Sequence, residues 1–94
     1  MFRTMLVVCL MLGLSSTTIS EAAPLNVLIL SGQNNHQWQV TTPWLEKGLE
    51  DTARFKVSVT EVPQTLDAAS LKGFDVIVSN WNTFVEDGVK EWPE

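Results

Sequence analysis

Residues 25–50 constrain the fold most, because they read as a strand, a polar loop and a helix in direct succession. Residues 25–30 are largely apolar with branched side chains, which is typical of a strand covered on both faces. After the polar loop at residues 31–36, Thr42 is the expected N-cap of the helix and Pro43 its first residue. In open α/β sheets, ligands bind outside the carboxyl ends of the strands. This loop is therefore the first place to look for a functional site.

Two further strands are predicted downstream. Residues 55–60 alternate strictly between apolar and polar side chains, as in a strand with one solvated face. Residues 74–78 contain consecutive β-branched side chains, which predicts burial on both faces. Residues 66–72 are interpreted as a loop or short helical turn, and residues 85–90 as a weak turn of helix.

This order of elements predicts an α/β fold with a parallel sheet and crossover connections. The alternating strand is expected at the edge and the two apolar strands inside, in the spatial order 2-1-3 that begins a flavodoxin-like sheet. Residues 31–36 and 80–83 would then lie side by side and line one crevice. Three strands with one clear helix cannot cover both sheet faces. We therefore expect residues 23–94 to be the N-terminal part of a larger, incomplete domain.

Residues 1–22 have the pattern of a secretory signal peptide. Arg3 supplies a positive start, residues 5–14 an apolar stretch too short to span a bilayer comfortably, and Ala22 a small residue for cleavage. The sequence thus predicts a secreted or periplasmic protein without a membrane segment after cleavage. Cys9 lies in this stretch and is the only cysteine, so the mature chain cannot form a disulfide, a zinc–thiolate site or a cysteine nucleophile.

The charge pattern narrows the range of partners. The formal net charge is −5, and acidic and basic residues are interspersed without a Lys/Arg stripe, which argues against nucleic acid. No glycine-rich phosphate loop is present. One histidine among neutral amides does not supply three metal ligands, so no metal site is predicted. The pattern does not identify a cofactor.

The candidate site residues of the first loop are His36 and Asn35. His36 is the only histidine, and its near-neutral pKa suits a general base or a hydrogen-bond partner of a sugar. The alternative is a histidine that orders the loop. Asn35 is assigned with equal weight to hydroxyl recognition or to a turn, whereas Asn34 is predicted to form a turn and Gly32 to serve backbone geometry.

A second polar and aromatic cluster follows the third strand. Asn80 is a candidate for substrate binding, and Trp81 is assigned with equal weight to stacking on a sugar ring or to core packing. Trp38 and Trp44 are predicted to pack between the helix and the sheet.

Residues 32–38, 41–45 and 48–52, together with the strand and turn at 74–80, resemble the start of ThuA-like (trehalose-utilisation) domains. The resemblance implies a three-layer α/β/α fold like that of class I glutamine amidotransferases. It also implies a link to trehalose or keto-disaccharide metabolism, often in exported bacterial proteins. ThuA-like domains continue into further strands, and the related amidotransferases use a cysteine, which the mature chain lacks; glutamine hydrolysis is therefore excluded.

These observations leave three hypotheses. The first is an exported ThuA-like domain that handles a small-molecule carbohydrate, with His36 catalytic, Asn35, Asn80 and Trp81 binding substrate, and further catalytic groups beyond Glu94. The second is a non-catalytic module that binds a sugar or a protein. The third is a fragment without activity of its own.

Overall fold

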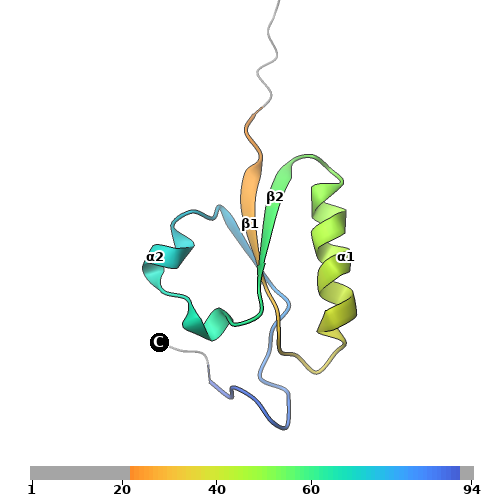
Figure 1. Ribbon diagram of the computed structural model, residues 1–94, viewed down its shortest axis with the longest axis vertical. Coiled ribbons are helices and arrows are strands. Elements are labelled where there is room, and N and C mark those ends of the chain that lie inside the picture. The colour runs from red at the N-terminus through yellow and green to blue at the C-terminus, as the bar shows by residue number, and fades with distance from the viewer. Residues whose placement is uncertain (1–21, 92–94) are drawn as a thin grey trace, which may run out of the picture.

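The computed structural model describes residues 22–91, and in this range a parallel sheet lies between helices on its two sides (Figure 1). The elements are, in chain order, β1 Leu25–Leu30, α1 Trp38–Glu50, β2 Phe55–Thr60, the 3₁₀ turn η1 Pro63–Thr65, α2 Ala68–Leu71 and β3 Val76–Ser79. Helix α1 covers one side of the sheet and the short α2 lies on the other (Figure 1). The predicted α/β class is therefore confirmed. The predicted signal peptide, except Ala22, falls outside the described residues.

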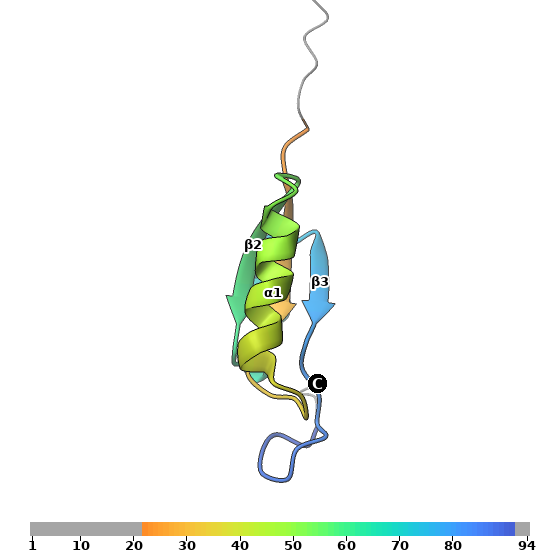
Figure 2. The ribbon, with the colours of Figure 1, turned by 90° about the vertical axis from the view of Figure 1, so that its right-hand side faces the viewer.

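The strand order is β2-β1-β3, and both pairs are parallel. Val27 is the Cα partner of Val57 on one side and of Val76 on the other. The predicted spatial order 2-1-3 is thus confirmed, and it is the order that begins a flavodoxin-like sheet. The arrowheads of the strands point the same way in Figure 2, so their carboxyl ends and the loops after them lie at one edge.

The buried core is centred on β1. Val27, Leu28, Ile29 and Leu30 are between 0% and 5% exposed, as expected for a strand with neighbours on both sides. In β3, by contrast, Val76 is 40% and Ile77 46% exposed. The prediction that this strand is buried on both faces is wrong for these side chains, because β3 has a strand neighbour on only one side among residues 22–91.

Helix α1 begins earlier than predicted. Its N-cap is Gln37, whose carbonyl accepts hydrogen bonds of 3.0 Å from the N–H groups of Val40 and Thr41. Thr42 and Pro43 lie inside the helix, so their assignment as N-cap and first residue is wrong. Proline removes one intrahelical hydrogen bond at this position. The turn before it is held by tertiary hydrogen bonds of the two threonine side chains, which no local pattern reveals.

The two tryptophans of α1 differ in burial. Trp38 is half-buried, but Trp44 is 76% exposed, so the prediction that Trp44 packs against the sheet is wrong. Trp44 lies six residues after Trp38, more than one and a half helical turns on, and therefore on another face of the helix.

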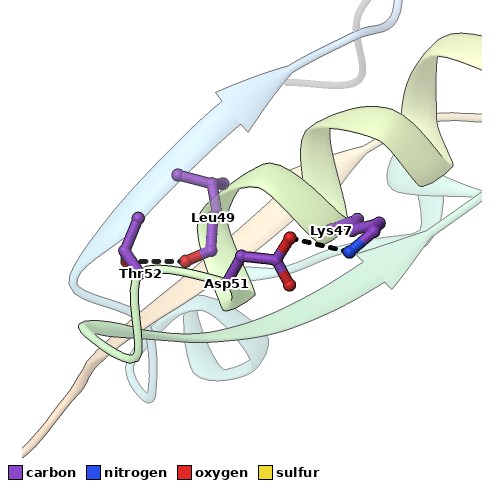
Figure 3. A network of polar contacts seen from close by, with 4 residues as sticks. All are labelled: Lys47, Leu49, Asp51 and Thr52. Carbon is purple, nitrogen blue, oxygen red and sulfur yellow. Dashed lines mark hydrogen bonds and ion pairs between the residues drawn. The ribbon is translucent and has the colours of Figure 1, made fainter.

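The carboxyl end of α1 is closed by local contacts (Figure 3). The Oγ1 of Thr52 donates to the Leu49 carbonyl at 2.7 Å, which satisfies one carbonyl of the last turn. Lys47 Nζ forms an ion pair of 2.7 Å with Asp51 Oδ2. Both charged side chains are more than 60% exposed, so this pair contributes only about 0.3–0.5 kcal/mol.

Of the two alternatives for residues 66–72, a loop or a short helical turn, the structure shows the helical turn as α2. Its start is a capping box, in which Asp67 Oδ1 accepts hydrogen bonds of 2.7 Å from the Ser70 hydroxyl and the Ser70 N–H. These bonds favour the ionised carboxylate and hold the pKa of Asp67 below its usual value. The helical turn predicted at residues 85–90 is wrong: this segment forms bends, and the N–H of Val89 bonds to the Gln33 side chain instead.

Candidate functional site

The loops after β1 and β3 meet at the carboxyl edge of the sheet. The side-chain amide of Asn34 donates hydrogen bonds of 3.0 Å to both the backbone carbonyl and the Oδ1 of Asn80. The N–H of Asn80 in turn donates to the Leu30 carbonyl at 2.8 Å. The structure therefore brings together the two loops that the sequence predicted to lie side by side.

The loop after β1 turns sharply at Gly32. Its φ is +96°, and a Cβ built there would lie 2.0 Å from the carbonyl oxygen of Glu61. Only glycine fits this turn without a backbone shift, which agrees with the predicted geometric role. Just before it, Ser31 is fully buried, and its N–H donates to the Thr60 carbonyl at 2.8 Å.

Asn34 has the turn-forming role that the sequence predicted. Its Oδ1 accepts a hydrogen bond of 2.6 Å from the N–H of His36, two residues on, as in an Asx turn. Asn34 is 9% exposed. Its side-chain amide thus fixes the backbone of His36 through the oxygen and bonds to Asn80 through the nitrogen.

Asn80 also reaches the start of α1. Its Nδ2 donates at 2.9 Å to the hydroxyls of Thr41 and Thr42, and the Thr42 hydroxyl shares a hydrogen bond of 2.6 Å with Ser31. One asparagine thus joins the β1 loop, the β3 loop and the first turns of α1.

The hydroxyl groups of Ser31, Thr41 and Thr42 also belong to this network, which was not predicted from the sequence. The available signal was the four-residue spacing of Trp38 and Thr42, which places both on the inner side of a helix that begins before Pro43.

The remaining candidates lie further out. Asn35 and His36 are exposed, and the Oδ1 of Asn35 accepts a hydrogen bond of 2.8 Å from Asn82 Nδ2. Among residues 22–91, the imidazole of His36 has no hydrogen-bond partner. Trp81 is half-buried. The catalytic role of His36 and the binding roles of Asn35, Asn80 and Trp81 stay predictions.

A further contact, not anticipated from the sequence, involves Gln33. Its Nε2 donates at 2.8 Å to the carbonyls of Asn82 and Val89, and its Oε1 accepts at 2.8 Å from the Val89 N–H. This side chain therefore fastens residues 82–89 to the loop after β1. No local pattern marks it, because its partners are backbone groups far along the chain.

The carboxyl edge of the sheet carries amide and hydroxyl side chains that form hydrogen bonds. In the part of the chain that the structure describes, no three His, Cys, Asp or Glu side chains gather as they would around a metal ion. The arrangement suits recognition of uncharged hydroxyl groups, for which amides supply both donors and acceptors.

Two hollows among the described residues lie elsewhere. The larger, of about 700 Å³, is at the amino edge and is lined by Ala22, Ala23, Leu25, Thr52, Ala53, Arg54 and Phe55. The smaller borders Pro43, Trp44 and Lys47. We place the candidate site at the carboxyl edge nevertheless, because the polar groups converge there, whereas the larger hollow is open and mainly apolar.

Neither helix among residues 22–91 has the length and apolar character needed to cross a bilayer. Comparisons of the chain with protein-family models, with curated proteins and with solved structures found no match. The fold and the edge together define an α/β protein with an amide-rich surface where two loops join.

Proposed function

We propose that this chain forms the carbohydrate-binding edge of an exported ThuA-like domain that acts in trehalose or keto-disaccharide metabolism. The observation that carries the proposal is the pair of hydrogen bonds from Asn34 to Asn80, which merges the loops after β1 and β3 into one surface. The resemblance of residues 32–38, 41–45, 48–52 and 74–80 to ThuA-like domains supplies the substrate class.

The polar side chains of this edge have two different roles, and the difference supports sugar binding. Asn34 and Asn80 use their side chains to hold the loops, so a contact between Asn80 and a sugar would require exchange of one bond to a threonine. Asn35 and His36 are exposed beside this inner pair. Amide and imidazole groups match sugar hydroxyls, because both kinds of side chain supply hydrogen-bond donors and acceptors.

His36 is the proposed catalytic residue. Its backbone is fixed by Asn34, while its exposed imidazole is accessible to a ligand. An imidazole nitrogen is a common general base in enzymes, so it can remove a proton from a sugar hydroxyl or from water.

The second candidate function, a non-catalytic binding module, is favoured by one observation. The side chains that converge at this edge are amides and hydroxyls, as in the contacts of Asn80 with Asn34 and Thr42, whereas glycosidic cleavage ordinarily uses a pair of carboxyl groups. The same surface would then retain a sugar without converting it.

Titration of the ¹⁵N-labelled protein with trehalose and with glucose tests the proposal. Amide shifts at residues 31–36 and 80–83, weakened by Asn35→Ala and His36→Ala but not by Lys72→Ala in the exposed α2 connection, would support it. Absence of any shift at this edge would overturn it.

A turnover assay on the same samples separates the two functions. Product formation that His36→Ala abolishes even at a trehalose concentration that saturates the variant indicates an enzyme. Binding of trehalose without product formation indicates a module.

A further inference from the structure

Residues 82–89 form a surface loop whose two ends are bridged by one side chain. Gln33 Nε2 donates to the carbonyls of Asn82 and Val89, and Gln33 Oε1 accepts from the Val89 N–H, each at 2.8 Å. The Asn82 N–H donates to the Gln33 carbonyl at 3.0 Å. Compact loops with closely spaced ends resemble Ω-loops, which are frequently functional.

The close approach of this loop to Gln33 depends on Gly88. A Cβ at position 88 would lie 2.4 Å from Gln33 Oε1. Inside the loop, the Phe84 N–H donates to Asn82 Oδ1 at 3.0 Å, and Lys90 Nζ bonds to the Val85 carbonyl. The loop is therefore held both at its ends and internally.

This ordered loop carries the most exposed large apolar side chain among the described residues, because Phe84 is 77% exposed. Asn82 connects it to the proposed sugar loop: its Oδ1 accepts from the Phe84 N–H and its Nδ2 donates to Asn35 Oδ1. Two hydrogen bonds from one side chain thus place the backbone of Phe84 next to Asn35.

We propose that Phe84 is a specificity-determining residue that stacks on the second ring of a bound disaccharide, with Gln33 as the positioning residue that holds its loop. The inference rests on the proposed function. The hydroxyl groups of one pyranose ring would form hydrogen bonds with the side-chain amides at the carboxyl edge of the sheet. The apolar C–H face of the next ring would lie on the aromatic face of Phe84. Aromatic rings present large, rigid apolar surfaces that suit such contacts.

Binding of trehalose and of glucose to Phe84→Ala and Gln33→Ala tests this inference. Phe84→Ala should weaken trehalose binding on the order of tenfold and leave glucose binding unchanged, whereas Phe84→Trp should retain trehalose binding. Gln33→Ala should weaken trehalose in the same way and also speed hydrogen exchange at the Val89 N–H. Val62→Ala is the matched control, because Val62 is another exposed apolar residue, 50% exposed, outside both loops.

The outcomes separate this inference from the proposal beneath it. Equal weakening of trehalose and glucose by Phe84→Ala, or no weakening of either, would overturn the role of Phe84 while leaving the edge as a sugar site. An effect of Val62→Ala as large as that of Phe84→Ala would overturn it as well. Failure of both sugars to bind the unmodified protein would overturn the two together.

Discussion

Strands β1 and β3 have similar apolar sequences but different surroundings. Ile29 in β1 is 0% exposed, whereas Ile77 in β3 is 46% exposed. β1 pairs with strands on both sides, and β3 pairs with β1 alone among the described residues. An apolar run therefore specifies a strand, whereas the burial of that strand depends on how many neighbouring strands it has in the sheet.

The loops after these strands continue the contrast. After β1, Ser31 and Asn34 are buried and hydrogen-bonded, but after β3 the chain is half-buried and carries the exposed Phe84. The second loop is attached to the first through Asn34 and Gln33. The rigid end of β1 thus organises the candidate site.

The largest expected effect comes from one substitution made in both strands. Ile29→Ala should lower the free energy of unfolding by about 2–5 kcal/mol, because it leaves a cavity at a fully buried position. Ile77→Ala removes the same atoms from a half-exposed position and should cost less than about 1 kcal/mol. Urea unfolding measures both, and equal losses would contradict the contrast between the strands.

Alanine at Gly32 and at Gly88 compares the two loops. Gly32→Ala should lower the free energy of unfolding by about 1–3 kcal/mol, since φ is +96° and the new Cβ would meet the Glu61 backbone. Gly88→Ala should have a smaller effect on unfolding, because the new Cβ would meet side-chain atoms of Gln33 and Val85 rather than backbone. Thermal unfolding of the pair measures the difference, and a larger loss at Gly88 would show that the second loop, rather than the first, is the rigid one.

A smaller effect is expected from the bridge between the loops. Asn80→Ala should lower the free energy of unfolding by about 1 kcal/mol, because half-buried hydrogen bonds lost to water contribute little net energy. A double-mutant cycle with Asn34→Ala should give a coupling of at least about 0.5 kcal/mol. Simple additivity of the two substitutions would mean that this contact does not join the loops in solution.

The smallest effect is expected in the connection that leads into β3. The lowered pKa of Asp67 means that its ionised form stabilises the folded state. This stabilisation is complete above the ordinary pKa of 3.8 and is lost as pH falls through the lower folded value. Asp67→Asn should therefore reduce the loss of unfolding free energy that the protein shows as the pH falls. Asp75→Asn serves as the comparison, because the Asp75 carboxyl group has another hydrogen-bond partner. If the free energy of unfolding falls with acidic pH in Asp67→Asn as it does in the unmodified protein, the capping box does not stabilise the fold.

Much of the fold could be predicted because its signals are local. The bounds of β1 and β2, the strand order and the turn roles of Gly32 and Asn34 follow from side-chain alternation, branched runs and turn chemistry. The predicted start of α1 was wrong because Pro43 is a strong local signal for a first helical residue. Hydrogen bonds from Asn80 to Thr41 and Thr42 outweigh it, and they join residues almost 40 positions apart.

The sequence by itself determined which segments become strands and that two polar loops follow them, because side-chain periodicity acts over a few residues. Only the tertiary structure decided that β1 is buried while β3 is exposed, that Asn80 binds two threonines, and that Gln33 holds the loop bearing Phe84. Burial and long-range hydrogen bonds depend on which segments become neighbours in space, and no local pattern contains that information.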